Sequence, residues 1–382
     1  MSKKMTMQEA ITEAKRCLNC SRPLCRTGCP IENNIPEFVR ALSEGNIGNA
    51  YETIAERSNL PAICGRVCAH EKQCEAHCIL AKKNSAISIG SLEMFIADFA
   101  HEYGLNPVPP STGKRGKVAV IGSGPAGLTV AGDLAKMDFA VTIFEGQPEP
   151  GGVLLFGIPE FRLEKEVVRR EINILRKLGV EIVTEKLIGP DMTVDDLFAQ
   201  GYDAIFMGTG TALPRTLDIP GQELSGILTA TYFLKVVVLA DSGKLDKKEV
   251  LIHDDDDVVV IGAGNVAIDA ARTAIRRTSG NVTVLYHKTA EDMTCLPSEY
   301  EAALKEGVQF KFLKKPLGYL NKKQMRALTN TRAKASPADE TELAGLLVQN
   351  IVKDPEGKFV ETRGQEIIPC DSVILAVGPR PA

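Results

Sequence analysis

The hydrophobic pattern of the first hundred residues is helical. Four apolar residues stand three or four positions apart, which is the spacing of one face of an amphipathic helix: Ile35, Phe38, Val39 and Leu42. We therefore predict an α-helical domain over residues 1–105. Prolines and glycines then gather in residues 106–116, which we expect to form a linker.

Beyond the linker, short apolar runs alternate with helical stretches. One run covers residues 117–121 and ends in a glycine turn, and a helix and a second run over 140–145 follow. The same unit recurs at residues 258–261 and 282–286. Repeated strand–helix–strand units predict parallel sheets. The expected fold class is α/β, with tandem Rossmann-like domains preceded by the helical domain.

These two units set the expected domain boundaries. The first dinucleotide-binding domain covers residues 117–215 and also receives a return strand from residues 366–382. The second dinucleotide-binding domain covers residues 216–365.

Charge and hydropathy limit the choice of partner and location. Lys and Arg number 45 against 49 Asp and Glu, a net charge of −4. This balance argues against a nucleic acid or an anionic membrane as the main partner. The chain has no apolar run of membrane-spanning length, and its N-terminal residues lack the apolar core of a signal peptide. We therefore expect a cytoplasmic protein without a membrane partner.

Eight of the ten cysteines are clustered in two blocks. The first block has the spacing Cys-x2-Cys-x4-Cys-x3-Cys-Pro and the second Cys-x3-Cys-x5-Cys-x3-Cys. Clustered cysteines in a reducing compartment favour metal binding over disulfides, and dense thiolates of this kind are typical of iron–sulfur clusters. Structural zinc and unliganded thiols are the alternatives, but zinc sites usually have shorter paired spacings. The blocks contain Cys17, Cys20, Cys25 and Cys29, then Cys64, Cys68, Cys74 and Cys78.

A first glycine-rich fingerprint follows the run at 117–121. Its glycines would let the backbone approach a pyrophosphate at the start of a helix, and Glu145 at the end of the next strand could accept hydrogen bonds from ribose hydroxyls. The segment therefore predicts a dinucleotide site. Its residues are Gly122, Ser123, Gly124, Pro125, Ala126 and Gly127.

A second fingerprint follows the run at 258–261, with Ala267 in place of the third glycine. Its candidate binding residues are Gly262, Gly264, Asn265 and Val266. At the end of the next strand, Lys288, and His287 if it is protonated, could bind a 2′-phosphate. We therefore favour NADP over NAD, and NAD stays open. Arg276 and Arg277 end the intervening helix, where the helix dipole alone favours them.

The cysteine region resembles a known family. Cys-Gly-Arg-Val-Cys at 64–68 and Ile-Gly-Ser-Leu-Glu at 89–93 are similar to the N-terminal domain of the glutamate synthase small (beta) subunit family. That family includes the N-terminal half of dihydropyrimidine dehydrogenase and the large subunit of the NADH-dependent ferredoxin:NADP oxidoreductases. The resemblance runs from about Ala14 to the C-terminus. It implies two [4Fe–4S] clusters.

The resemblance also implies the cluster ligands. One cluster would be held by Cys17, Cys20, Cys25 and Cys78. The other would be held by Cys29, Cys68, Cys74 and the carboxylate Glu93. Alternatively, Glu93 is a solvated helix residue. Cys64 is left over and is expected to pack as a small buried thiol.

The same resemblance implies FAD at the first nucleotide site. Two further segments, 151–159 and 204–211, are similar to the FAD site of the family, although their glycines could also be ordinary turn residues. Arg162 faces either flavin or phosphate, or merely caps a surface helix. The candidate FAD residues in this part are Gly152, Val153, Gly157, Ile158, Arg162, Thr209 and Gly210.

Family members continue from a strand like 371–382 to a Gly-Asp motif and a helix that contacts FAD. No such motif follows here. We expect either a truncated chain or a flavin site completed by a partner, with FAD held more weakly than in a longer relative.

These features together predict an NAD(P)H-dependent FAD oxidoreductase. Hydride would pass from NAD(P)H to FAD, and single electrons would pass through the clusters to a partner. We name no catalytic side chain, because hydride transfer needs none. By resemblance the acceptor is a glutamate synthase large subunit, a pyrimidine-reducing subunit or ferredoxin. A non-catalytic relay or scaffold subunit is one alternative. A disulfide reductase is a weaker one, since only Cys295 and Cys370 occur between 106 and 382.

Overall fold

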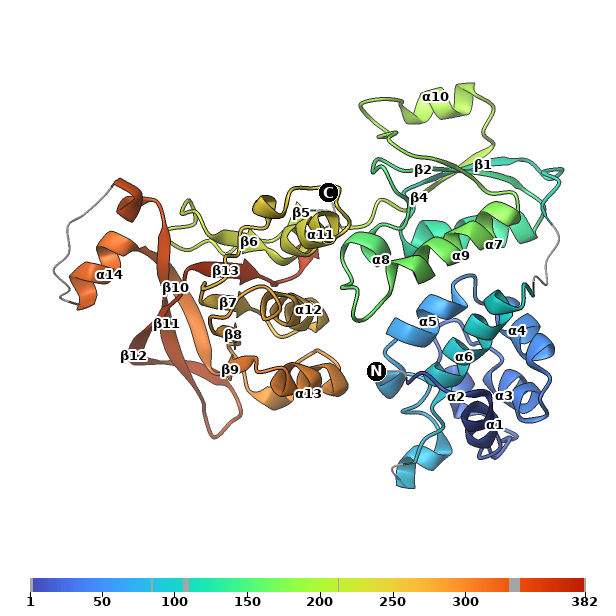
Figure 1. Ribbon diagram of the computed structural model, residues 1–382, viewed down its shortest axis with the longest axis horizontal. Helices are drawn as coiled ribbons and strands as arrows, with labels where there is room; N and C mark the ends of the chain where they lie inside the picture. Colours follow the sequence, from blue (N-terminus) through green and yellow to red (C-terminus); the bar gives the residue numbers. More distant parts are fainter. Residues whose placement is uncertain (1–2, 84, 106–109, 212, 330–336, 381–382) are drawn as a thin grey trace. The chain divides into compact units, whose positions relative to one another are not determined.

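The chain forms two compact units, Met1–Gly210 and Thr211–Ala382 (Figure 1). The computed structural model describes the residues 3–83, 85–105, 110–211, 213–329 and 337–380. Part of the expected linker, 106–109, lies outside these residues.

The first unit begins with a helical region, as the sequence predicts. The four apolar residues at helical spacing all lie on one helix, α3, where each is at most 3% exposed. They pack against α1, α4 and α6 in one hydrophobic cluster. The region contains α1 (Met7–Ala14), α2 (Leu24–Thr27), α3 (Ile35–Ser43), α4 (Ile47–Ala55), α5 (Pro61–Val67), the 3₁₀ helices η1 (His70–Lys72) and η2 (Ile79–Lys83), and α6 (Ile89–Glu102).

A four-stranded parallel sheet completes the first unit. Its strand order is β3-β2-β1-β4. Both central strands are apolar and largely buried, because helices cover both faces of the sheet: α7 and α9 lie on one side and α10 on the other (Figure 1). The elements are β1 (Lys117–Ile121), α7 (Pro125–Lys136), β2 (Ala140–Phe144), α8 (Val153–Phe156), α9 (Lys165–Lys177), β3 (Glu181–Val183), α10 (Val194–Ala199) and β4 (Ala204–Met207).

The second unit is built on a five-stranded parallel sheet. Its order is β6-β13-β7-β8-β9. Val258 and Val260 of β7 face the helices α11, α12 and α13, whereas Val259 and Ile261 face the opposite side. The elements of the second unit from its start to strand β9 are β5 (Leu213–Pro214), β6 (Ile227–Thr229), α11 (Ala230–Asp241), η3 (Lys247–Glu249), β7 (Val258–Ile261), α12 (Asn265–Ala274), β8 (Val282–Leu285), η4 (Ala290–Asp292), α13 (Pro297–Lys305) and β9 (Gln309–Lys311).

A three-stranded antiparallel sheet covers the opposite side (Figure 1). The sequence reading did not separate this sheet from the second nucleotide domain. Leu346 and Val348 of its central strand are fully buried against the five-stranded sheet. The remaining elements are β10 (Lys314–Asn321), α14 (Lys322–Thr329), η5 (Pro337–Glu340), β11 (Leu343–Lys353), β12 (Phe359–Pro369), β13 (Ser372–Leu375) and β14 (Pro379–Arg380).

The strand expected to return to the first domain lies elsewhere. Residues 372–375 form β13, which hydrogen-bonds to β6 and β7 inside the five-stranded sheet. Val373, Ile374 and Leu375 are buried there on both faces. A short apolar strand fits either of two similar parallel sheets, so its sequence carried no signal that distinguished them.

No helix in the described ranges is long and apolar enough to cross a membrane.

The ion pairs of Glu306 in the second unit should make the stability of the fold depend on pH. Its carboxylate pairs with Arg272 and Arg276 at 2.7–2.9 Å. Burial opposes ionisation, but the two guanidinium groups outweigh it and lower the pKa of Glu306 from 4.5 to about 2. Because the folded pKa is depressed, this stabilisation is present above pH 4.5 and is lost as pH falls toward 2.

Glu306→Gln should therefore lower the melting temperature near neutral pH and reduce the loss of stability below pH 4.5. Thermal unfolding followed between pH 2 and pH 7 measures this. Glu301→Gln, at an exposed position on α13, the helix whose C-terminus Glu306 caps, is the control. If the melting temperatures of the Glu306 variant and the wild type fall equally steeply below pH 4.5, the ion pairs of Glu306 do not cause the acid sensitivity.

Candidate functional site

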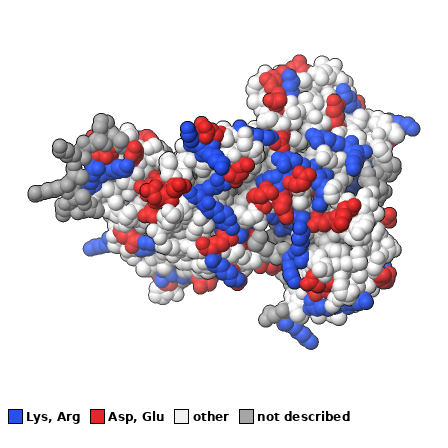
Figure 2. Space-filling view, viewed as in Figure 1, with Lys and Arg blue, Asp and Glu red and all other residues white. Residues whose placement is uncertain are grey.

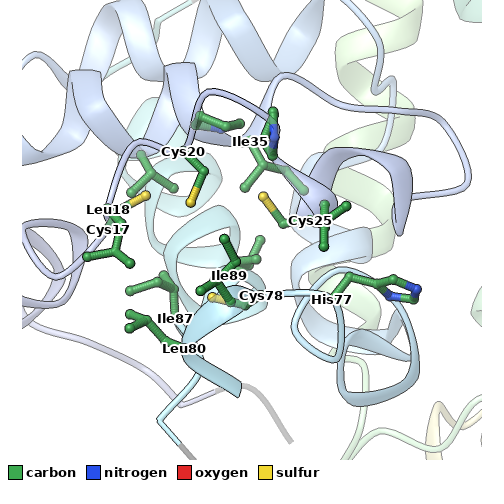
Figure 3. Close-up of a pocket in the computed structure, with 15 residues that line it drawn as sticks. Cys17, Leu18, Cys20, Cys25, Ile35, His77, Cys78, Leu80, Ile87 and Ile89 are labelled. Carbon is green, nitrogen blue, oxygen red and sulfur yellow. The ribbon is translucent and has the colours of Figure 1, made fainter. Parts of the chain in front are cut away.

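Four cysteines converge on one pocket in the helical region. The sulfur atoms come from the α1–α2 loop, α2 and the residue before η2, and Figure 3 shows them arranged around a common space. These four are the set that the family resemblance assigns to one cluster. The pocket is otherwise lined almost entirely by apolar side chains, and three of those on its rim, Leu18, Leu24 and Ile79, are 43–59% exposed. The cysteines are Cys17, Cys20, Cys25 and Cys78.

The environment of these thiols fits a cluster with soft ligands. Burial, followed by the neighbouring thiols, raises the pKa of Cys25 to about 11, and burial also raises the pKa of Cys17. Thiols must be deprotonated to bind metal, so the positive charge of bound iron would have to offset this environment. Four cysteine sulfurs around an apolar pocket are the donor set that iron–sulfur clusters use. Within the described residues, no three His, Cys, Asp or Glu side chains form the ligand set of a single metal ion.

The second expected ligand set is partly brought together. Burial raises the pKa of Cys74, and the carboxylates of Glu75 and Glu93 and the thiol of Cys29 raise it further, so these groups share one environment. Glu93 is 8% exposed, and burial raises its pKa well above the usual value. The alternative of a solvated Glu93 is therefore wrong.

Cys68, the remaining member of this set, lies beside Cys64. The Cys68 thiol, followed by burial, raises the pKa of Cys64 well above its usual value, and Cys64 in turn helps to raise the pKa of Glu93. The leftover Cys64 is partly buried and also receives a hydrogen bond from Ser58 Oγ at 4.0 Å. Cys64 therefore borders the expected second centre, which the sequence did not indicate.

The first glycine-rich turn requires glycine for a measurable reason. Gly122 has φ +94°, and a Cβ there would lie 2.5 Å from the carbonyl oxygen of Gly208. A Cβ on Gly127 would lie 1.9 Å from the carbonyl oxygen of Gly122. Around Gly124, which caps α7, no other atom of the described chain lies within 4 Å of such a Cβ. Pro125 and Ala126 then open α7, so the free N–H groups at its start face an open edge where an anion can bind.

Glu145 stands at this edge, as expected, and is tied to the turn. Its Oε2 accepts hydrogen bonds from the N–H of Ser123 at 3.0 Å and from Ser123 Oγ at 2.5 Å. Its Oε1 accepts the N–H of Gln147 at 2.8 Å. A carboxylate has about four acceptor positions, so capacity for ribose hydroxyls remains. The fingerprint pattern did not reveal the role of Ser123 as a brace.

Two other expected FAD segments meet the same turn. Gly152, with φ +52°, is so close to Gly124 that a Cβ would lie 2.8 Å from its Cα. The segment from Val153 to Ile158 forms α8 and the turn after it, and Gly157 packs on Val153. Buried Lys165 donates from Nζ to the carbonyls of Leu154 and Ile158, which fixes this segment.

The third segment follows β4. Gly208 hydrogen-bonds to Ile121, and Thr209 lies within 3.5 Å of a Cβ built on Gly122. Gly210 has φ +73° and ends the first unit. Arg162 is partly buried and begins no surface helix, because α9 starts at Lys165.

The second fingerprint has the same local form. Gly262 has φ +132°, and a Cβ there would lie 2.5 Å from the carbonyl oxygen of Ala376. Gly264 caps α12, and Asn265 Oδ1 accepts the N–H of Leu296 at 2.8 Å. Val266 is 43% exposed, whereas Ala267 is fully buried. The buried alanine shows that this turn has room for the methyl group that the first turn lacks.

His287 and Lys288, the two candidate cations after β8, differ in charge at neutral pH. Burial, then Lys288 and Lys315, lower the pKa of His287, so its ring is neutral at pH 7. Lys288 therefore carries the fixed charge, and its Nζ lies 6.0 Å from the Phe359 ring. Lys315 comes from β10, in the three-stranded antiparallel sheet that the sequence pattern does not distinguish from the second nucleotide domain. The N–H of Lys314 bonds to the carbonyl of Tyr286, which brings this strand beside His287.

Other residues singled out in the sequence have structural roles. Arg276 pairs with Glu306 and Arg277 with Asp241. Both arginines lie after the last residue of α12, Ala274, so ion pairs that the helix-dipole interpretation did not include engage them. Cys295 and Cys370 are buried in different hydrophobic clusters, so they form no redox pair.

Two glycine-rich turns at the edges of parallel sheets and a pocket lined by four cysteines define an oxidoreductase of the dinucleotide-binding class with an iron–sulfur region. Residues 1–105 match the family described as dihydropyrimidine dehydrogenase domain II, 4Fe-4S cluster, and residues 116–382 match the pyridine nucleotide-disulphide oxidoreductases. The chain belongs to the glutamate synthase small chain-like family of NAD(P)H-dependent FAD oxidoreductases. The fold class and family expected from the sequence are thereby confirmed.

Individual relatives support this placement. The chain is 36% identical over 377 residues to the glutamate synthase (NADPH) small chain of Halomonas elongata, covering 98% of this chain and 77% of that protein. It is 31% identical over 380 residues to the NADP(+)-dependent formate dehydrogenase subunit beta of Moorella thermoacetica, covering 93% and 50%. FprA from Mycobacterium tuberculosis in complex with NADPH shares the fold, with a TM-score of 0.51 and 20% identity over 69% of this chain and 71% of that chain.

Proposed function

We propose that this chain takes hydride from NAD(P)H and delivers single electrons, through two [4Fe–4S] clusters, to an acceptor on another chain. The observation that carries the proposal is the convergence of Cys17, Cys20, Cys25 and Cys78 on one pocket in a chain that also holds two dinucleotide fingerprints. When bound, FAD supplies the conversion between a two-electron hydride and single electrons.

The chain's own residues bind and orient these groups. The backbone N–H groups at the start of α7 face the position for the FAD pyrophosphate, and Glu145 stands where ribose hydroxyls would lie. The turn from Gly262 to Val266 offers the same arrangement to the nicotinamide dinucleotide. Cys29, Cys68, Cys74 and Glu93 would hold the second cluster, with a carboxylate as its one hard ligand.

The acceptor is proposed to be a separate chain. The relatives named above are a small chain and a subunit beta, which are parts of multi-subunit enzymes. An acceptor resembling the glutamate synthase large subunit, a pyrimidine-reducing subunit or ferredoxin would receive the electrons.

Anaerobic purification followed by iron, sulfide and flavin analysis tests the proposal. About eight iron and eight sulfide per chain with one FAD are expected. Stopped-flow mixing with NADPH should then bleach the flavin first and the clusters afterwards. Zinc without sulfide would overturn the cluster assignment. Bound flavin that NADH and NADPH both fail to reduce would instead favour a non-catalytic relay.

We further propose NADPH as the preferred donor, because Lys288 supplies a fixed cation three residues after the end of β8. Lys288→Ala should raise the KM for NADPH about tenfold, which corresponds to about 1.4 kcal/mol, and leave the KM for NADH nearly unchanged. Initial rates of dye reduction with each donor measure this. Lys314→Ala is the matched control, since Glu366 already neutralises that lysine at 2.7 Å. An equal loss with both donors would contradict a contact to the 2′-phosphate.

A further inference from the structure

A buried arginine joins the cysteine-bearing helices to the first dinucleotide-binding fold. The Arg66 side chain, near the end of α5, is 6% exposed. Its Nε donates to Glu164 Oε2 at 2.9 Å, and its Nη2 donates to Asp98 Oδ2 at 2.9 Å. Its Nη1 returns to the carbonyl of Ala62 at 3.1 Å. One guanidinium therefore fixes its own helix to α6 and to the residue that precedes α9, using the planar fork that lysine lacks.

Asp98 of α6 makes this contact a three-helix junction. Its second oxygen accepts a hydrogen bond from Arg170 of α9 at 2.6 Å. Burial tends to raise the pKa of Asp98, but the hydrogen bonds from Arg66 and Arg170 outweigh it and lower the pKa. The carboxylate of Asp98 is therefore charged at neutral pH and lies between the guanidinium groups of Arg66 and Arg170. On the molecular surface, acidic and basic side chains are likewise interleaved over α9 (Figure 2).

Further contacts continue the same seam. Glu171 of α9 is 2% exposed and accepts the N–H of Ala62 at 3.2 Å. Asn59, just before α5, donates to Asp133 and to the carbonyl of Thr129, both on α7, at 2.5 and 3.0 Å. The cysteine-bearing region is thus held to the nucleotide fold by polar groups that lose water on contact, and such contacts are specific in geometry.

The junction lies beside the proposed second centre. Arg66 precedes Cys68 by two residues, and Asp98 stands on the same helix as Glu93. We propose that Arg66 is a positioning residue for the centre formed by Cys29, Cys68, Cys74 and Glu93: it holds α5 and α6 against the start of α9 and keeps a permanent cation two residues from the ligand Cys68. The role of Arg66 toward the second centre rests on the proposed function. The junction that Arg66 makes between the helices rests on the structure alone.

The positional part is tested by hydrogen–deuterium exchange on the full chain. Arg66→Met should speed amide exchange in α5 at least tenfold, because the helix loses its bonds to Asp98 of α6 and to Glu164, which precedes α9. Asp98→Asn should speed exchange in α5 and α6 for the same reason. Arg40→Met, an exposed arginine on α3, is the control and should leave α5 unchanged. Unchanged exchange in α5 of both junction variants would overturn the positional part.

The electrostatic part is tested by the reduction potential of the second centre, followed by electron paramagnetic resonance during a redox titration. Cluster potentials follow the net charge around the cluster. Arg66→Met removes a cation and should lower the potential, whereas Asp98→Asn removes an anion and should raise it. Arg66→Lys keeps the charge and should retain a potential close to that of the wild type.

Opposite shifts separate a charge effect from simple loosening, which would move both variants in one direction. Shifts in the same direction, or none, would overturn the electrostatic part. If the wild-type chain contains no iron and sulfide, the proposed function fails and the electrostatic part fails with it, while the exchange result still decides the junction.

Discussion

Replacing Cys25 by alanine is expected to reduce the iron and sulfide content from about eight to about four atoms of each per chain. Cys25 is one of the four cysteines that line the pocket, and three sulfurs leave one iron of a cubane without its protein ligand. The second set draws on other residues, so its cluster should remain. Metal and sulfide analysis of anaerobically purified protein, with electron paramagnetic resonance of the reduced state, measures this loss.

Cys64→Ala is the matched control for this experiment. Cys64 lies in the same helical region and borders the second set, but the ligand assignment leaves it out. It should retain all the iron that the wild type holds. If Cys64→Ala loses as much iron as Cys25→Ala, the assignment of ligands is wrong.

Replacing Gly127 by alanine is expected to abolish most FAD binding. The added Cβ would stand 1.9 Å from the carbonyl oxygen of Gly122, which is a backbone atom and cannot rotate away. Helix α7 must then shift from the turn. Overpacking of this kind costs about 3 kcal/mol, or a weakening of FAD binding by about 100-fold. Flavin fluorescence on titration of the apoprotein measures the dissociation constant.

Gly124→Ala, in the same turn, distinguishes an effect on FAD binding from an effect on the stability of the fold. No other atom of the described chain lies within 4 Å of a Cβ at Gly124, so the thermal stability of the apoprotein should stay close to that of the wild type. FAD affinity should nevertheless fall, because the methyl group occupies the approach to the pyrophosphate. An unchanged affinity in both variants would place FAD elsewhere.

The comparison of the two fingerprints shows where sequence patterns are sufficient. Alternating apolar runs and glycine turns predicted both parallel sheets, since burial on two faces requires continuous apolar strands. The strands β1 and β7 lie where the pattern placed them. The pattern did not explain why Gly127 and Ala267 differ at corresponding positions. The reason is the 1.9 Å approach in the first turn, which depends on how α7 meets β1.

The sequence by itself determined the fold class, the two fingerprints and the clustering of eight cysteines in two blocks, because these depend on local periodicity and spacing. Spacing alone did not place Cys78 with Cys17, Cys20 and Cys25; only the family resemblance implied that set, and the structure brings the four together. Only the tertiary structure decided which sheet β13 joins, that Ser123 braces Glu145, and that Arg66, Asp98 and Arg170 form one junction. Those contacts connect residues separated in the sequence by 22 positions, for Ser123 and Glu145, up to 114 positions, for Val258 and Ser372. They are set by packing and burial in three dimensions, for which a single sequence carries no periodic signal.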